Sequence, residues 1–409
     1  MKKSYKNLIL EAAAKDQAKI LEFTKKLTAI ATENPPGSFY KECINSIAAE
    51  LSDLGLDYEI IEIPDQNSDQ EIKCLPRYCL TSSYGKGEKT FYFHGHYDVV
   101  PASRKEQFNP VIKNGCLFGR GASDMKSGLA AMIYAVKAIK TSNIDLNGKI
   151  GLVIVPDEET GGTLGSKYLS DKNILGKNAI GMLTAEPTSG VIWNANRGAV
   201  SLRVIVKGKP AHVGLQYEGI NAFENMVDVV KALQELKKEV VSRITKFNIY
   251  QEQAKRSILM LGGRCDGGTS FNLVPGECSF TVDRRINPEE DLEEEKHRLI
   301  NTIEACEKNG IDLEIEMLQE GESAGSPENS PIAHALVKNI KEVTGKKPVF
   351  EMCPGLLETR FYAKKGIPAF AYGPGILSVS HGPDEFVKIS DIYKCTSIYA
   401  LTALDVLSD

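Results

Sequence analysis

An apolar run that ends in metal-binding chemistry is the feature that most constrains this chain. Residues 91–101 read Phe-Tyr-Phe-His-Gly-His-Tyr-Asp-Val-Val-Pro, a pattern that predicts a buried strand with His96 and Asp98 at its carboxyl end. Alternate residues of a strand share a face, so we expect the Asp98 carboxylate to accept the proton of the His96 ring nitrogen that a metal does not use. Most histidines near carboxylates are simply satisfied polar groups, so a metal site at this strand needs support from the rest of the chain.

Length and composition predict an ordinary globular protein with two domains. The 409 residues exceed what one hydrophobic core usually supports. Apolar residues make up 42% of the chain and charged residues 25%, which is typical of globular proteins. A net charge of -5 gives no electrostatic reason to expect nucleic acid or an anionic membrane as a partner. We therefore expect a small-molecule or peptide substrate.

Neither a secretory signal nor a membrane anchor is expected. Glu11, Lys15 and Asp16 interrupt the N-terminal stretch before an apolar segment of signal-peptide length can form, and no other run approaches the length of a membrane span. The nine cysteines are scattered and form no Cys-x-x-Cys pair. Reduced thiols in a cytoplasmic protein are the simplest interpretation.

The order of elements in residues 1–196 predicts an α/β domain. Helices are expected at 16–31, 42–54 and 129–139, and strands near 57–63, 91–96, 149–156 and 179–184. Strands that alternate with helices form a mostly parallel central sheet with helices on both faces, and such sheets bind ligands at the carboxyl ends of their strands. Residues 319–409 are expected to complete this domain with helices at 331–343 and from 390 onward, and with strands near 348–352 and 368–372.

Residues 197–318 follow a different plan. Strands are expected at 199–207, 257–263, 277–284 and 311–317, and helices at 219–239 and 288–308. This βαββαβ order is the ferredoxin-like plan and predicts an α+β domain inserted into the first one. The expected domains are therefore 1–196 together with 319–409, and 197–318.

The strand ends and one late loop supply a set of potential metal ligands. These are His96, Asp124, Glu158, Glu159, Glu186 and His381. Imidazole and carboxylate ligands suit zinc, and less tightly cobalt or manganese. A carboxylate with both oxygens free can bridge two ions about 3.5 to 4 Å apart, and we expect Asp124 to do so. Adjacent glutamates usually mark a solvated face, but Glu158 and Glu159 follow a buried strand, where one can bind metal while the other serves as general base.

The glycine-rich stretch before Asp124 permits a second interpretation. Residues 119–124 read Gly-Arg-Gly-Ala-Ser-Asp, which begins like a dinucleotide-binding fingerprint, but aspartate occupies the third glycine position. Its carboxylate would repel a pyrophosphate. The chain has no Walker phosphate loop and no Gly-x-Ser-x-Gly motif, so neither kinase-like nor serine-hydrolase chemistry is expected.

Five ordered motifs resemble those of one enzyme family. They are Gly95–Pro101, Gly119–Lys126, Asp157–Glu159, Glu186–Pro187 and Ser380–His381. Together they resemble the zinc amidohydrolases and exopeptidases, a family that includes acetylornithine deacetylase, succinyl-diaminopimelate desuccinylase, aminoacylase and glutamate carboxypeptidase. The resemblance covers nearly the whole chain, the inserted domain included, and is specific for the family but not for the substrate.

The resemblance implies a role for each residue of the set. The ligands of two zinc ions would be His96, Asp124, Glu159, Glu186 and His381, with Asp124 as the bridge. Glu158 would be the general base, and Asp98 would orient His96. The inserted domain would serve as a lid and as the contact surface of a homodimer. From it His212 would donate to the oxyanion of the tetrahedral intermediate, often across the dimer; the alternative for His212 is an ordinary surface-loop histidine.

The resemblance also implies substrate contacts. Asn272 and Arg285 match positions that grip the carbonyl and the carboxylate of the substrate, a task that suits the guanidinium fork. Gly355 begins a loop that lies near the substrate carboxylate in relatives. Many relatives read Gly-Gly-Thr-Asp-Ala-Arg-Phe where residues 355–361 read Gly-Leu-Leu-Glu-Thr-Arg-Phe. Leu356 and Leu357 are therefore expected to make the pocket smaller or more apolar.

The remaining histidines and one arginine look ordinary. His94 is expected to be a packed core histidine rather than a group that supports the site, and His297 and His334 to be surface residues. Arg284 is expected to be an exposed neighbour of Arg285.

These observations predict a two-metal hydrolase that cleaves the amide bond of an N-acyl amino acid or a similar small substrate. A metallo-exopeptidase acting on short peptides is the nearest alternative, because an acyl group and an aminoacyl group present the same bond to the metals. A third possibility is a non-catalytic relative that only binds a ligand, although such a protein would not need Glu158.

Overall fold

The computed structural model of the chain describes residues 2–64 and 75–408. The chain divides into two compact units. The first comprises Met1–Asn194, Gly325–Glu351 and Glu358–Asp409, and the second comprises Ala195–Ala324 and Met352–Leu357. The short segment Met352–Leu357 thus packs with the second unit although it lies far along the chain.

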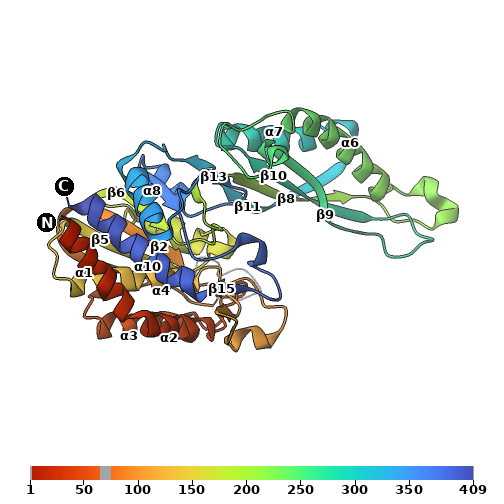
Figure 1. Cartoon of the computed structure of the whole chain (residues 1–409). Helices are drawn as coiled ribbons and strands as arrows, with labels where there is room; N and C mark the ends of the chain where they lie inside the picture. Colours follow the sequence, from red (N-terminus) through yellow and green to blue (C-terminus); the bar gives the residue numbers. More distant parts are fainter. Residues whose placement is uncertain (1, 65–74, 409) are drawn as a thin grey trace. The chain divides into compact units, whose positions relative to one another are not determined.

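The first unit is built on a sheet that has eight strands among the described residues (Figure 1). Its strands are β1 (Tyr58–Ile63), β2 (Arg77–His96), β5 (Asn147–Val155), β6 (Ala179–Thr184), β7 (Ile192–Asn196), β12 (Ala324–Gly325), β13 (Phe350–Cys353) and β14 (Ala369–Ala371). The strands β2, β5, β6 and β14 pair in parallel, whereas β1 and β7 add antiparallel pairs. The predicted mostly parallel sheet is confirmed, with antiparallel strands added to it.

Strand β2 is longer than the predicted strand because it flanks β5 on both sides. Ile154 of β5 pairs with Leu80 from the first half of β2 and with Gly95 from the second half. Between the halves, Gly85 has a φ of +107° and lies so close to Gly148 that a Cβ would stand 2.5 Å from the Gly148 carbonyl oxygen. Only glycine fits there. The second half delivers His96 to the carboxyl end of the strand.

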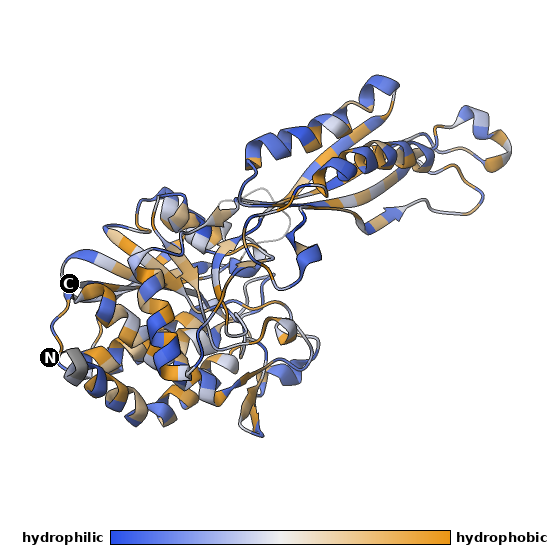
Figure 2. Cartoon of the chain, turned by 45° about the horizontal axis from the view of Figure 1, so that its top comes forward, coloured by the Kyte–Doolittle hydropathy of each residue, from blue (hydrophilic) through white to orange (hydrophobic). Residues whose placement is uncertain are grey.

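Helices cover both faces of this sheet. Along β5, Ile154 faces one hydrophobic cluster, which also contains residues of α4 (Lys126–Thr141) and α10 (Ile389–Leu407). Val155 faces the other, which contains residues of α5 (Tyr168–Asp171) and α9 (Thr359–Ala363). The further helices of this unit are α1 (Lys2–Lys15), α2 (Gln17–Thr28), α3 (Tyr40–Asp53) and α8 (Pro331–Thr344). Figure 2 shows the alternation of hydrophobic and hydrophilic residues along these helices, which follows from one buried and one solvated face.

A small three-stranded sheet stands beside the loops that carry the site. Its strands are β3 (Val111–Lys113), β4 (Cys116–Phe118) and β15 (Phe386–Lys388), paired antiparallel in the order β15-β4-β3. Phe118 pairs with Phe386, so the residues that follow β4 lie opposite those that precede β15. This sheet was not predicted from the sequence.

The second unit has the predicted ferredoxin-like order. It runs β8 (Gly198–Lys207), α6 (Ala222–Val240), β9 (Ile258–Gly267), β10 (Glu277–Ile286), α7 (Leu292–Glu304) and β11 (Asp312–Gly321). The strands form an antiparallel sheet in the order β11-β8-β10-β9, and its buried face packs against α6 and α7. Both helices begin at a side-chain cap: Asn221 accepts from the backbone of Phe223 and Glu224, and Asp291 accepts from Glu294.

The prediction that Arg284 is exposed was wrong. Arg284 is only 1% exposed and forms ion pairs with Glu290 at 2.6 Å and with Glu295 at 2.7 Å. Every second residue of β10 faces the helices, so Arg284 shares its face with Val282 and Ile286 and must find carboxylates there. His297 and His334 are exposed, as predicted. None of the helices in residues 2–64 and 75–408 combines the length and hydrophobicity that a membrane span requires.

Candidate metal centre

The parallel strands of the first unit end at one edge of the sheet, and the predicted ligands lie there. His96 is the last residue of β2, and Glu186 follows β6 by two residues. Glu159 lies in the 3-10 turn Glu158–Thr160 after β5, and Asp124 comes just before α4. His381 lies in the loop before β15, with a φ of +64°. Topology therefore collects side chains that are far apart in the sequence.

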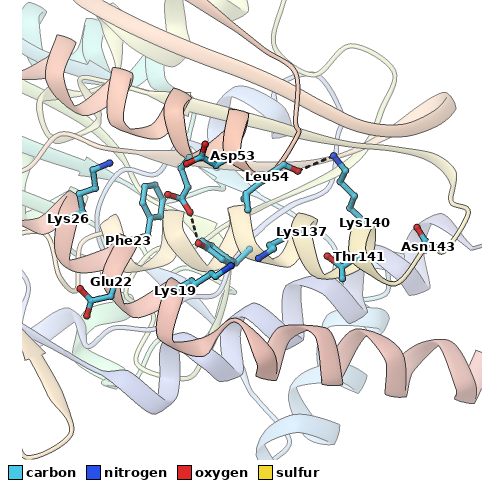
Figure 3. Close-up of a pocket in the computed structure, with 12 residues that line it drawn as sticks. Lys19, Glu22, Phe23, Lys26, Asp53, Leu54, Lys137, Lys140, Thr141 and Asn143 are labelled. Atoms are coloured by element: carbon cyan, nitrogen blue, oxygen red, sulfur yellow. Dashed lines mark hydrogen bonds between the residues drawn. The ribbon is translucent and has the colours of Figure 1, made fainter.

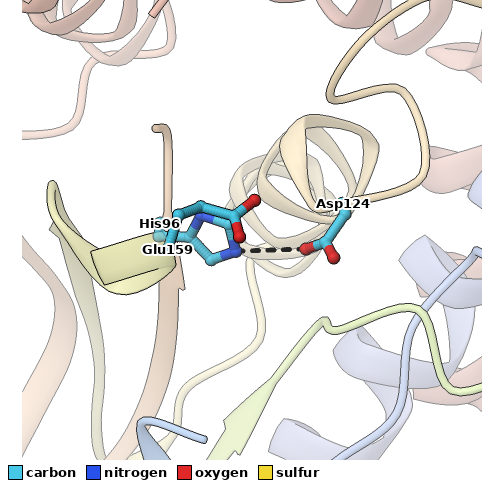
Figure 4. A group of neighbouring side chains, drawn as sticks. All are labelled: His96, Asp124 and Glu159. Atoms are coloured by element: carbon cyan, nitrogen blue, oxygen red, sulfur yellow. Dashed lines mark hydrogen bonds and ion pairs between the residues drawn. The ribbon is translucent and has the colours of Figure 1, made fainter. Parts of the chain in front are cut away.

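Asp124 stands between the two histidines. Its Oδ1 lies 3.2 Å from Nε2 of His96, an interaction drawn as the dashed line in Figure 4, and its Oδ2 lies 3.4 Å from Nε2 of His381. Glu186 joins the first histidine, with Oε1 at 3.7 Å from Nε2 of His96, and Glu159 joins the second, with Oε2 at 3.1 Å from Nε2 of His381. All five predicted ligands thus form one cluster with two halves, and the two oxygens of Asp124 face different halves.

The cluster has the character of a cation site. His96, Asp124 and Glu159 each offer one ligand atom, and these atoms lie within 4.8 Å of one another. Among the described residues, Oε1 of Glu159 and Oε1 of Glu186 are buried without a hydrogen-bond partner. Buried carboxylates are expected to be paired, hydrogen-bonded or bound to a metal. The donor set of imidazoles and carboxylates therefore fits a divalent transition metal.

The carboxylates of the cluster raise the pKa of both histidines. Hydrogen bonds with Asp124 and Glu159 raise the pKa of His381 to about 11. Burial opposes the charge of His96, but Asp124, Asp98 and Glu186 together raise its pKa well above the usual range. Burial raises the pKa of Glu186 to about 7. A bound cation would replace the protons on the two histidines.

Asp98 lies next to His96, but the nearest acceptor to the His96 ring is the main-chain oxygen of Asp98 and not the carboxylate that was predicted. Nδ1 of His96 is 3.0 Å from the main-chain oxygen of Asp98 and 3.4 Å from its Oδ1. The Asp98 carboxylate accepts the main-chain N–H groups of Glu158 and Glu159, each at 3.2 Å, and the amide of Asn34 at 2.9 Å. The main-chain oxygen of Asp98 thus holds the ring of His96, and its buried carboxylate holds the turn that carries the two glutamates.

Asp157 stabilises the same turn, a role that was not predicted from the sequence. Its Oδ1 accepts from Thr160 Oγ1 at 2.6 Å and from Asn34 at 3.2 Å, and its Oδ2 accepts from the Leu164 N–H at 2.8 Å. Asn34, more than a hundred residues away, could not be found from sequence spacing. Inside this turn, burial raises the pKa of Glu158 well above its usual range, and the nearby Glu186 and Glu159 add to the effect.

His94 belongs to a buried polar cluster beneath the turn. Its Nδ1 lies 3.1 Å from the Tyr362 hydroxyl, and its Nε2 lies 3.0 Å from Ser166 Oγ and 3.3 Å from Oε2 of Glu358. Glu358 presses against Gly162, where an added Cβ would stand 2.5 Å from Oε1. His94 is a packed core histidine, as predicted, but its partners also support the loop after Glu158.

Comparison with known proteins decides the family. The family model described as Peptidase family M20/M25/M40 matches residues 92–405, which is most of the chain. This chain belongs to that family. The M20 proteins are hydrolases of amide bonds, so the chain is an enzyme of that class and the predicted resemblance is confirmed.

Several relatives of this M20 protein are named for deacylation. The succinyl-diaminopimelate desuccinylase of Pelagibacter ubique is 28% identical over 374 residues, which cover 87% of this chain and 91% of the relative. A probable succinyl-diaminopimelate desuccinylase of Staphylococcus epidermidis is 26% identical over 383 residues, covering 88% and 89%.

Solved structures of M20 proteins share its fold. The di-peptidase Dug1p of Saccharomyces cerevisiae has a TM-score of 0.82 at 17% identity and covers 99% of both chains. The M20 family metallo-carboxypeptidase Sso-CP2 of Sulfolobus solfataricus has a TM-score of 0.78 at 20% identity, covering 95% of this chain and 99% of that one. At these identities the similarity supports the fold alone.

The predicted lid residues of this M20 protein belong to the second unit. His212 is exposed, and its Nδ1 accepts from the Gly214 N–H at 3.1 Å. His212 and Asn272 lie in neighbouring segments, since the N–H of Val213, next to His212, donates to the main-chain oxygen of Asn272 at 2.9 Å. Arg285 is held by Asp283, with Nε to Oδ1 at 2.7 Å and Nη2 to Oδ2 at 2.9 Å. A substrate carboxylate would therefore have to share Arg285 with Asp283.

The first residues of the loop whose sequence differs from that of many relatives, Gly355–Leu357, also belong to the second unit. The Gly355 oxygen accepts from the Arg197 N–H at 3.1 Å. Leu357 is buried, and Leu356 packs so closely on Gly321 that a Cβ there would stand 2.8 Å from Leu356 Cδ2. At least part of the apolar surface of these leucines is thus used for packing inside the unit.

A separate pocket of about 870 Å³ lies between α2, α3 and α4 and contains no predicted site residue (Figure 3). Several of its charged groups have partners nearby: Lys137 pairs with Asp16, Lys140 donates to the Leu54 oxygen, and Glu50 accepts from Tyr134. The pocket is therefore separate from the cluster of candidate ligands.

Proposed function

We propose that this M20 protein is a two-metal hydrolase that removes the acyl group from an N-acyl amino acid or a closely similar small molecule. The observation that carries the proposal is the position of Asp124, whose two oxygens face His96 and His381. Glu186 completes one half of the cluster and Glu159 the other. These five residues would hold two zinc ions, for which cobalt or manganese could substitute.

When bound, such a pair of cations acidifies a water molecule toward a pKa of about 7 and polarises the scissile carbonyl. Glu158 lies in the turn next to Glu159 and supplies the general base. Because burial raises the pKa of Glu158, its carboxylate readily takes the proton of the attacking water and later passes it to the departing nitrogen. Asp98 supports this step by holding the main-chain N–H of Glu158.

We also propose roles for residues of the second unit. We assign His212 as the donor to the oxyanion, and Asn272, Arg285 and the loop at Gly355 as contacts of the substrate's carbonyl and carboxylate. The exposure of His212 supports a role in binding something other than its own unit. We also propose a homodimer through this unit, supported by exposed apolar side chains near His212, among them Phe271 at 99% exposure. The scattered cysteines favour a cytoplasmic location.

The deacylase is favoured over the exopeptidase because relatives that match over most of their length are named as desuccinylases or probable desuccinylases. Both activities break the same type of bond, so the substrate decides between them.

Hydrolysis of a mixed panel tests the proposal. Purified protein is reconstituted with zinc or cobalt and incubated with N-acetyl, N-succinyl, N-formyl and N-carbamoyl amino acids beside dipeptides, and products are identified by mass spectrometry. We expect release of free amino acid from one acyl class, and none from the Glu158→Ala variant. Cleavage of dipeptides alone would establish the exopeptidase instead, and no turnover by protein with two bound metals would contradict the proposal.

A further inference from the structure

A buried ion pair lies behind the metal cluster, and the ligand set does not include it. Nη1 of Arg120 is 2.6 Å from Oε2 of Glu385, and the two residues are 1% and 2% exposed. Arg120 follows β4 and Glu385 precedes β15. Because Phe118 pairs with Phe386, the small sheet holds the two residues opposite each other, and the Gly119 N–H donates to the Glu385 main-chain oxygen at 3.0 Å.

Glu385 is bonded to the backbone of Asp124. Its Oε1 accepts the main-chain N–H of Asp124 at 3.1 Å and that of Ser123 at 2.9 Å. The carboxylate therefore uses one oxygen for Arg120 and the other for the segment that carries the central residue of the metal cluster. Hydrogen bonds from N–H groups to a charged carboxylate are among the stronger ones in proteins.

Arg120 is bonded to the backbone of His381. Its Nη2 donates to the main-chain oxygen of His381 at 3.0 Å and lies 3.4 Å from the oxygen of Pro101. Oδ2 of Asp124 lies 3.4 Å from Nε2 of His381, so the contacts among these four residues form a closed ring. It runs from Asp124 through Glu385 and Arg120 to His381.

A buried ion pair is weak evidence for stability, because hydrophobic residues of similar volume often serve as well. Glu385 and Arg120 also form hydrogen bonds with the main chain of two predicted ligands, Asp124 and His381. A pair that only stabilised the fold would not require these bonds. We propose that Arg120 and Glu385 are positioning residues that hold Asp124 and His381 at the spacing one metal ion needs. The inference rests on the proposed two-metal function.

The geometry makes the effect unequal across the cluster. His96 is oriented by Asp98 and by its place at the end of β2, and neither depends on the ion pair. His381 lies in a loop, and Arg120 holds its main-chain oxygen. Loss of the pair should therefore weaken binding in the half that contains His381 more than in the half that contains His96.

The test is calorimetric titration of metal-free protein with zinc, which does not depend on turnover. Glu385→Gln keeps an oxygen that can accept from Asp124 but presents an amide to Arg120. Arg120→Lys keeps the charge but cannot span Glu385 and His381 at once. The matched control is Asp384→Asn, which breaks the neighbouring but exposed Arg104–Asp384 pair.

We expect the wild type and Asp384→Asn to bind two ions per chain with equal affinities in the two proteins. In Glu385→Gln and Arg120→Lys one of the two ions should bind roughly 10- to 100-fold more weakly, which is the usual effect of losing a residue that supports a metal ligand. Wild-type affinity for both ions in the folded variants would overturn the inference. Should the single variants fail to fold, Arg120→Met combined with Glu385→Leu removes the buried charges together; weakened binding by this double variant supports positioning, and unchanged binding refutes it. Fewer than two ions in the wild type would instead contradict the proposed function itself.

Discussion

The Asp98 carboxylate accepts the main-chain N–H of Glu158 at 3.2 Å, so the residue predicted to orient a metal ligand also holds the predicted general base. The same carboxylate accepts from Glu159 and stands beside the ring of His96. A change at Asp98 should therefore disturb ligand and base together.

Asp98→Asn tests this double role. The asparagine side chain keeps one acceptor oxygen and presents an amide to the other N–H, so the turn of Glu158 and Glu159 loses one anchor. We expect a fall in kcat and in metal affinity of about 10- to 100-fold each. Steady-state kinetics and zinc titration provide the two readouts. Loss of activity with unchanged zinc affinity would show that Asp98 positions only the turn of Glu158 and Glu159 and not the metal ligand His96.

Glu158→Gln tests the general base. Glutamine has nearly the same shape but cannot accept a proton, so kcat should fall on the order of 10²- to 10⁴-fold. Glu158 is not among the proposed ligands, and metal content by atomic emission should remain at the wild-type value. Nearly full activity in this variant would show that another residue is the general base. Loss of bound metal would show that Glu158 is a metal ligand.

Metal binding should release protons. The pKa of His381 is raised to about 11 by Asp124 and Glu159, so its ring holds a proton near neutral pH that a metal must displace. Protons on the metal-free site compete with zinc, and zinc affinity should therefore rise from about pH 6 to about pH 8. Calorimetric titrations in buffers of different ionisation enthalpy give the number of protons released. Zinc affinity independent of pH would contradict the proton balance of the cluster.

Gly162→Ala tests the support beneath the base. Gly162 has a φ of +70°, and a Cβ there would meet Oε1 of Glu358 at 2.5 Å. Gly190→Ala is the matched control, because its φ is +87° but its Cβ would meet nothing within 4 Å. We expect the left-handed backbone to reduce the free energy of unfolding by about 1–2 kcal/mol in both variants. The contact with Glu358 should add about 1–3 kcal/mol in Gly162→Ala alone. Urea unfolding measures the free energy of unfolding of both variants. Equal losses would show that the Glu358 side chain moves away from the added Cβ without a cost in stability.

The fold was largely predictable because its signals are local. Apolar runs marked strands such as β5 and β6 within two residues of their observed ends. Imidazole and carboxylate residues at strand ends and in one late loop indicated the candidate ligands, and the order of elements indicated the ferredoxin-like plan. The missed helix α1 has a weaker pattern, since its described buried face is formed by Ile9 and the small residues Ala12 and Ala13.

The supporting contacts could not be predicted, because they depend on distant parts of the chain. Glu385 pairs with a residue 265 positions away, and Asn34 reaches Asp98 across 64 positions. Spacing gives no signal for either. Arg284 is different: the alternation along β10 places it on the buried face with Val282, so its burial could have been read from the sequence. The roles of His212, Asn272 and Arg285 stay predictions.

The most direct test of the two-metal centre is anomalous diffraction from crystals grown with zinc, recorded at the zinc absorption edge. We expect two peaks, one beside His96 and Glu186 and the other beside His381 and Glu159, with the Asp124 carboxylate between them. A single peak, or two peaks that do not share Asp124, would contradict the account.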